Sequence, residues 1–286
     1  MPTYVPSRDG VEVAVHDLGG PTHGAAPVAL FAHATGFHGR AWEPVAARLA
    51  DRVRCVALDL RGHGEARTPE DLTFEWSGFG ADVVAVLDAG VLPPGAPVLG
   101  VGHSMGGAAL VLAARERRGV FAALWMYEPV IPPPGALLSA DGPNPLADGA
   151  ARRRARFDSL DAAIANYASK PPLDALRADA LRAYVEGGFA VEPGGEAVLR
   201  CRPEWEAATF RMARHSGAWD ALGQLDIPVV VAVGAEEPFT PSAFADAIVT
   251  DARHGRLSRH PELGHFGPLE DPDTIAEEVA ALAATV

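Results

Sequence analysis

A serine bracketed by glycines is the first group in this sequence that could do chemistry. Ser104 lies in Gly102-His103-Ser104-Met105-Gly106-Gly107, between the apolar run 96–101 and the alanine-rich segment 108–114. A strand, a tight turn and a helix in this order are typical of the G-x-S-x-G nucleophile elbow. The pattern predicts a serine hydroxyl at a helix start, where the N–H of Met105 can stabilise an oxyanion. The alternative is a strand-to-helix turn in which Ser104 only caps the helix.

A serine hydroxyl is a poor nucleophile at neutral pH unless a base lies within hydrogen-bond reach. Among ten histidines, His265 is the best candidate, because it lies in the turn Gly264-His265-Phe266-Gly267 after the last expected strand, 256–259. A loop at that point of an α/β chain can return over the sheet edge. The order serine, acid, histidine along the chain also fits a catalytic triad.

Two glutamates compete to be the acid that orients His265. Glu128 ends the apolar run 121–127, and Glu237 lies in the acidic loop 234–241 that follows the run 227–233. A carboxylate at the end of a buried strand is costly without a partner, which favours Glu128. Both strand ends are expected at the same crevice, so the residues alone leave both glutamates open.

The elements that must position these groups alternate between strand and helix. Continuous apolar runs, typical of strands buried on both faces, recur at 28–32, 53–58, 96–101, 121–127 and 227–233. Helical segments separate them, and residues 4–15 are expected to form an opening hairpin. This alternation predicts an α/β fold with a mostly parallel sheet, helices on both faces and functional groups at the carboxyl ends of the strands.

The pattern changes after Glu128, where the chain becomes rich in proline and glycine and then helical in composition. We expect a helical cap at 131–222, inserted in a core made of 1–130 and 223–286. Its expected helices are 150–157, 160–167, 174–186 and 202–215, with 196–200 as a candidate short strand. The run Arg152-Arg153-Arg154 is read first as a solvated helix face and second as a ligand-facing patch.

The amino-acid composition limits the classes of partner that the protein can have. The chain has 37 acidic and 24 basic residues and a formal net charge of −13, which argues against nucleic acid or an anionic membrane as partner. Cys55 and Cys201 form no disulfide framework or metal-binding spacing, and the N-terminus has no signal-peptide character. A cytoplasmic monomer or homodimer that acts on a small molecule is therefore expected.

The motifs together resemble the α/β-hydrolase superfamily over the whole chain outside the insertion, which corresponds to the family's variable cap. The resemblance rests on the elbow, the turn 59–64, the loop that begins at His33 and the turn around His265. It implies Met105 and Thr35 as the oxyanion-hole amides. The family's usual acid after the penultimate strand is aspartate, whereas this chain has Glu237; Glu128 resembles the acid of haloalkane dehalogenases and zearalenone-type lactonases. Glu128 is therefore favoured narrowly, with Glu237 as the alternative.

The resemblance implies a serine hydrolase that cleaves a small to medium apolar ester or lactone through an acyl-enzyme, with no metal or organic cofactor. Ser104 argues against the dehalogenases and epoxide hydrolases, which use aspartate, and His103 and Phe266 weaken carbon–carbon bond hydrolysis. A carbon–carbon bond hydrolase, a thioesterase, an acyltransferase or cyclase, and a ligand-binding protein with little turnover remain alternatives. Most large apolar cap residues are expected to pack, and a few to line the site; they are Phe157, Tyr167, Tyr184, Phe189, Trp205, Phe210, Met212 and Trp219.

Overall fold

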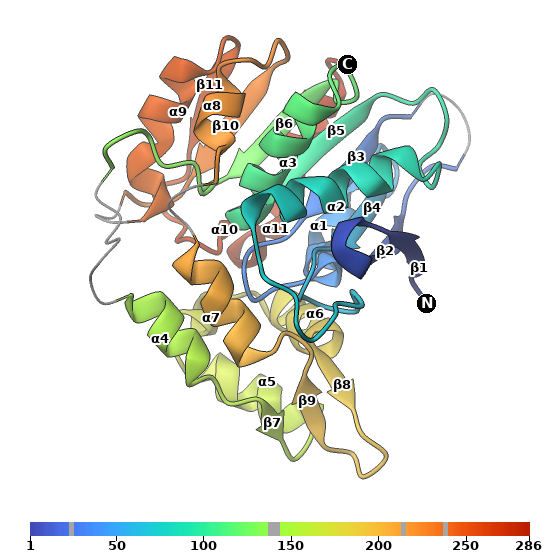
Figure 1. Ribbon diagram of the computed structural model, residues 1–286, viewed down its shortest axis with the longest axis vertical. Helices are drawn as coiled ribbons and strands as arrows, with labels where there is room; N and C mark the ends of the chain where they lie inside the picture. The colour runs from blue at the N-terminus through green and yellow to red at the C-terminus, as the bar shows by residue number, and fades with distance from the viewer. Residues whose placement is uncertain (23–25, 137–143, 213–215, 237–239) are drawn as a thin grey trace.

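The computed structural model describes residues 1–22, 26–136, 144–212, 216–236 and 240–286. Its centre is an eight-stranded sheet in the order β1-β2-β4-β3-β5-β6-β10-β11 (Figure 1). The strands β1 and β2 form the expected antiparallel hairpin, β2 is also antiparallel to β4, and the other neighbours are parallel, which confirms the mostly parallel sheet. The strands are β1 (Thr3–Pro6), β2 (Glu12–Gly19), β3 (Val28–Ala32), β4 (Arg54–Asp59), β5 (Val98–His103), β6 (Ala123–Tyr127), β10 (Val229–Val233) and β11 (Gly255–Arg259).

Alternate residues of each central strand enter two different hydrophobic cores. In β4, Val56 and Leu58 join one core, whereas Cys55 and Ala57 join the other, on the opposite face. Burial on both faces is why these strands read as continuous apolar runs. The first core is closed by α2 (Trp76–Asp88), α3 (Met105–Glu116), α8 (Ala218–Leu222) and α9 (Ala245–Asp251), and the second by α1 (Glu43–Leu49) and α11 (Pro272–Ala283).

The short helices of the core are η1 (Arg8–Gly10), η2 (Gly39–Trp42), η4 (Pro241–Phe244) and α10 (Gly267–Glu270). Across the described residues, none of the helices combines the length and apolar character that a bilayer span requires.

The cap is a mixed structure and not purely helical. It gathers at one end of the molecule, below the sheet in Figure 1. An antiparallel sheet in the order β7-β9-β8 accompanies its helices, and the candidate strand at 196–200 is one of these strands. The helix expected at 150–157 is wrong, because only its first two residues are helical, at the end of α4, and its last two form β7. The cap elements are α4 (Pro145–Ala151), β7 (Arg156–Phe157), α5 (Leu160–Ala168), η3 (Leu173–Ala175), α6 (Ala178–Gly188), β8 (Phe189–Val191), β9 (Ala197–Leu199) and α7 (Pro203–Arg211).

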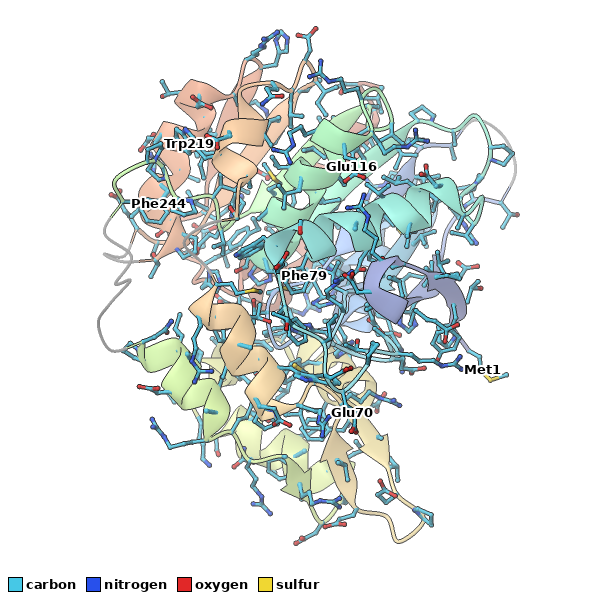
Figure 2. The ribbon with its side chains drawn as sticks, in the orientation of Figure 1. Met1, Glu70, Phe79, Glu116, Trp219 and Phe244 are labelled. Atoms are coloured by element: carbon cyan, nitrogen blue, oxygen red, sulfur yellow. The ribbon has the colours of Figure 1, made fainter. Side chains whose placement is uncertain are left out.

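Helix α8 packs with the core, although it falls inside the range 131–222 expected for the cap. Ala218, Ala221 and Leu222 are buried in the core cluster closed by α3. Figure 2 shows Trp219 and Phe244 on the lobe that holds the sheet, away from the cap helices. The compact cap therefore ends with α7.

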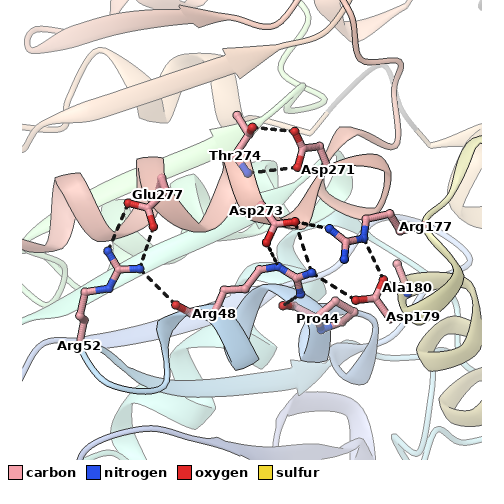
Figure 3. Close-up of polar contacts among 10 residues, drawn as sticks. All are labelled: Pro44, Arg48, Arg52, Arg177, Asp179, Ala180, Asp271, Asp273, Thr274 and Glu277. Atoms are coloured by element: carbon pink, nitrogen blue, oxygen red, sulfur yellow. Dashed lines mark hydrogen bonds and ion pairs between the residues drawn. The ribbon is translucent and has the colours of Figure 1, made fainter.

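A cluster of ion pairs fastens the cap to the core (Figure 3). Asp273 of α11 pairs with Arg48 of α1 and with Arg177, which directly precedes cap helix α6. Arg48 also reaches Asp179 of α6, with 3.3 Å between Nη2 and Oδ2. Because these side chains are partly exposed, water and salt screen the pairs, and we expect them to orient the cap more than to stabilise the fold.

Candidate active site

Ser104 occupies a strained turn between β5 and α3. Its φ of 52° and ψ of −113° are unusual for a residue with a side chain, and such strain costs on the order of 1–3 kcal/mol. Both flanking glycines are required, because a Cβ on Gly102 would lie 2.7 Å from Gly107 Cα and a Cβ on Gly106 would overlap the Ala32 carbonyl oxygen. The Ser104 N–H donates to the carbonyl of Tyr127 at the end of β6, 2.9 Å away. The surrounding backbone therefore holds the turn in its strained form.

Glu128 and His265 are brought together from distant parts of the chain. Nδ1–H of His265 donates to Oε2 of Glu128 across 2.6 Å, and the N–H of Gly234 donates to Oε1 across 3.0 Å. The Glu128 side chain is 2% exposed, so both carboxylate oxygens are paired in a nearly dry site. Because Nδ1 carries the proton, Nε2 of His265 is left as the acceptor that a general base needs.

The loop that carries His265 is attached to the ends of β5 and β6. Nε2–H of His103, the residue before Ser104, donates to the main-chain carbonyl of His265 at 2.8 Å. The Tyr127 hydroxyl donates to the carbonyl of Gly264 at 2.7 Å. Burial, followed by the nearby His265, lowers the pKa of His103 well below its usual range, so His103 stays neutral. The residue types gave no sign of this role for His103.

The loop after β3 lies against the first turn of α3. Nδ1–H of His33 donates to the carbonyl of Ala34 at 2.8 Å, and the N–H of Leu60 donates to His33 Nε2 at 3.0 Å. Burial is the largest cause that lowers the pKa of His33 to about 3. Thr35 lies in the turn that follows, and Met105 is the first residue of α3, whose N–H has no acceptor within the helix. The assignment of these two amides as an oxyanion hole stays a prediction.

The other candidate acid, Glu237, lies outside the described residues. Its strand, β10, pairs directly with β6, with Ala232 opposite Tyr127. Glu128 and the segment that carries Glu237 therefore follow neighbouring strands. For this reason, position in the sequence could not decide which of the two glutamates is the acid.

Aromatic rings from three segments meet beside these groups. Phe37 of the β3 loop lies 4.7 Å from Tyr184 of α6 and 5.3 Å from Phe266, measured between ring centroids. Phe157 and Phe189, in contrast, are buried in the cap's own part of the same cluster. The cap thus meets the core next to His265 through a layer that is mainly apolar.

A buried ion pair of the cap also touches the β3 loop, and the sequence pattern missed it. Nη1 of Arg153 donates to Oε2 of Glu206 at 2.7 Å, and their side chains are 14% and 10% exposed. Arg153 follows the end of α4, so the expectation of a solvated helix face is wrong for this arginine, whereas Arg152 and Arg154 are exposed. Helical composition does not reveal where a helix ends, and that position decides which arginine turns inward.

The model of the alpha/beta hydrolase family matches residues 29–278. Protein phosphatase methylesterase 1 of Bos taurus is 46% identical over 94 residues, which make up 31% of this chain and 24% of the methylesterase. The chain therefore spans about a quarter of the length of that relative.

Solved structures share the fold over nearly the full length. E-2-(acetamidomethylene)succinate hydrolase has a TM-score of 0.78 at 21% identity, over 98% of each chain. A thermophilic esterase from Thermogutta terrifontis has a TM-score of 0.72 at 19% identity, over 100% of this chain and 98% of the esterase.

Proposed function

The chain belongs to the alpha/beta hydrolase family, and we propose that it is a serine hydrolase of carboxylic esters or lactones. The observation that carries the proposal is the hydrogen bond from Nδ1–H of His265 to buried Glu128. The loop that contains His265 is bound to His103, the residue before Ser104. A neutral imidazole with a fixed tautomer is what a serine hydroxyl requires for activation.

In the proposed mechanism, Nε2 of His265 takes the proton of Ser104 as Oγ attacks the carbonyl carbon. The N–H groups of Met105 and Thr35 donate to the oxyanion, and Glu128 stabilises the protonated imidazole. The leaving alcohol then takes the proton from His265, which leaves an acyl-enzyme. Water, deprotonated by His265, attacks the acyl carbon, and Ser104 leaves with the proton restored to its oxygen. No metal or organic cofactor takes part.

The substrate we propose is small to medium and mainly apolar. The layer of Phe37, Tyr184 and Phe266 beside His265 supports this. A methylesterase and an esterase among the similar proteins support an ester as the scissile group. We further propose that the enzyme works in the cytoplasm as a monomer or homodimer, without nucleic acid or a membrane as partner; its buried, unpaired Cys55 and Cys201 and its net charge of −13 are consistent with that setting.

The test is hydrolysis of p-nitrophenyl butyrate by the wild type and by Ser104→Ala. The wild type should release about one equivalent of nitrophenolate in a burst and then turn over, because the acyl-enzyme accumulates. Ser104→Ala should abolish the burst and lower kcat by about 10⁴-fold or more. Ser169→Ala is the control, since Ser169 lies on the cap surface and donates to the main-chain carbonyl of Asn166. A wild-type rate in Ser104→Ala would refute the proposal, and so would ligand binding without any turnover.

A further inference from the structure

One ring nitrogen of His63 is buried without a partner, close to the proposed active site. His63 lies in the turn after β4 and is 1% exposed. Its Nδ1–H donates to the carbonyl of Arg61 at 2.9 Å, so Nε2 is an acceptor. Within the described residues, Nε2 has no hydrogen-bond partner. Burial lowers the pKa of His63, which keeps that nitrogen unprotonated. An unpaired buried acceptor costs about 1–3 kcal/mol, which a donor on a ligand would recover.

Glu206 of the cap supplies a second acceptor in the same region. Its Oε2 accepts from Arg153, whereas Oε1 lies against the β3 loop, 2.5 Å from where a Cβ on Gly36 would be. In the described part of the chain, no donor besides Arg153 reaches this carboxylate. Tyr167 and Tyr184 hold the guanidinium from its other side. Because Arg153 balances the charge of Glu206, the pair presents an acceptor oxygen with little net charge.

The strand order puts His63 on one flank of Ser104, and Glu206 reaches the same flank from the cap through its contact with Gly36. The loop after β4 carries His63. The β3 loop comes next and is called the oxyanion loop, because the N–H of Thr35 is proposed to donate to the oxyanion. The loops after β5 and β6 follow, with Ser104 and Glu128. The rings of His33 and His63 are 5.1 Å apart, so His63 adjoins the start of the oxyanion loop. The leaving alcohol must lie at His265, which donates its proton, so the acyl group is the part of the substrate that extends toward His63.

We propose that Nε2 of His63 binds the substrate by accepting a hydrogen bond from a hydroxyl group on the acyl chain, with Glu206 as a neighbouring acceptor. The preferred substrates are then esters of hydroxylated acids whose carbon chain is otherwise apolar. The proposal rests on the proposed hydrolysis by Ser104 and adds the feature by which acyl groups are distinguished. A site built to pair with a hydroxyl discriminates strongly against the analogue that lacks it, because its polar group is then left unpaired.

The test compares p-nitrophenyl butyrate with its 2-hydroxy and 3-hydroxy derivatives. For the wild type, kcat/KM should be about ten-fold or more higher for at least one hydroxylated ester. In His63→Phe that ratio should fall to about one, and in His63→Gln, whose side-chain carbonyl can accept a hydrogen bond, part of it should return. His254→Phe is the control, because His254 is exposed and bonds to Asp226 at 3.1 Å; it should keep the wild-type ratio.

Equal rates for the wild type on all three esters would overturn the inference, as expected if Nε2 only holds a water molecule that no substrate displaces. A preference that survives unchanged in His63→Phe would also overturn it. If circular dichroism shows that His63→Phe does not fold, His63→Leu replaces it. The same ratio of kcat/KM values, hydroxylated ester to p-nitrophenyl butyrate, is then measured for His63→Leu. Failure of the proposed function looks different: the wild type would then not hydrolyse p-nitrophenyl butyrate through Ser104, and the inference would fall with it.

Discussion

His103 holds the main-chain carbonyl of His265 at 2.8 Å. The residue directly before the proposed nucleophile thus positions the loop of the proposed base, although 162 residues separate them in sequence. The two rings lie 5.0 Å apart, and burial keeps His103 neutral, so it acts as a donor and not as a second base. The elbow therefore fixes Ser104 and, through its neighbour, the approach of His265.

Loss of this donor should slow catalysis without removing any reacting group. We expect His103→Leu to lower kcat by about 10–100-fold, because a small displacement of a general base is costly. His103→Gln, whose amide can still donate to the carbonyl, should recover most of the rate. KM should change little in either variant, which separates positioning from binding. Steady-state kinetics with p-nitrophenyl butyrate decide this, and equal rates for the two variants would contradict it.

The two candidate acids can be separated by matched substitutions. Glu128→Gln removes the charge that stabilises protonated His265 and should lower kcat by about 10²–10⁴-fold. Glu237→Gln makes the same chemical change and should leave kcat within about two-fold of the wild type. The outcome that reverses the assignment is a large loss in Glu237→Gln with a small one in Glu128→Gln.

The sequence predicted the parts of this molecule that depend on local pattern. The run 28–32 indicated a buried strand because every one of its residues enters one of the two cores. The elbow was recognisable because the steric demand for Gly102 and Gly106 is local. The mostly parallel sheet followed from the alternation of such segments.

What could not be predicted depends on contacts between distant segments. The strands of the cap are two or three residues long, and β8 pairs with β9 across a turn, so they carry too little periodicity to distinguish them from helix ends. Arg153 looks like its neighbours Arg152 and Arg154 until the end of α4 and its pairing with Glu206 are known. His63 could be judged only from its surroundings, because an unpaired nitrogen is a property of the packed structure.

Gly36 should tolerate an added side chain less well than Gly119, which has nearly the same backbone conformation. Gly36 and Gly119 have φ of 79° and 76°, but a Cβ would meet Glu206 at Gly36 and open space at Gly119. Both alanine variants should lose about 1 kcal/mol of unfolding free energy from backbone strain. Gly36→Ala should also lower kcat/KM, because Glu206 and the oxyanion loop must move apart. Urea unfolding and kinetics test this, and equal activity of the two variants would contradict it.

The ion pairs of Figure 3 should control how tightly the cap is held. Asp273→Asn removes a charge that pairs with both Arg48 and Arg177. We expect faster hydrogen exchange in α6 with little change in global stability, because the pairs are exposed. Glu277→Gln is the matched control, since Glu277 pairs with Arg52 within the core, 3.0 Å apart. Exchange in α6 that is equally slow in both variants would show that the cap is held by its apolar contacts alone.

Acid should destabilise the fold through histidines that are buried in the neutral form. Burial is the largest cause that lowers the pKa of both His33 and His38 to about 3, against 6.5 for an unfolded histidine. Between these values the unfolded chain binds more protons than the folded one, so the stabilisation is complete above about pH 6.5 and is lost as the pH falls toward 3. At pH 5 each histidine costs about 2 kcal/mol of unfolding free energy.

His38→Gln tests this directly, because glutamine does not titrate and its amide can still donate to the carbonyl of Tyr184, which His38 Nε2–H reaches at 2.9 Å. Urea midpoints at pH 7.5 and pH 5 should differ less in this variant than in the wild type, by an amount worth about 2 kcal/mol. His254→Gln, at an exposed position, should keep the wild-type difference. An unchanged pH dependence in His38→Gln would mean that His38 becomes protonated in the folded state without penalty, which its burial argues against.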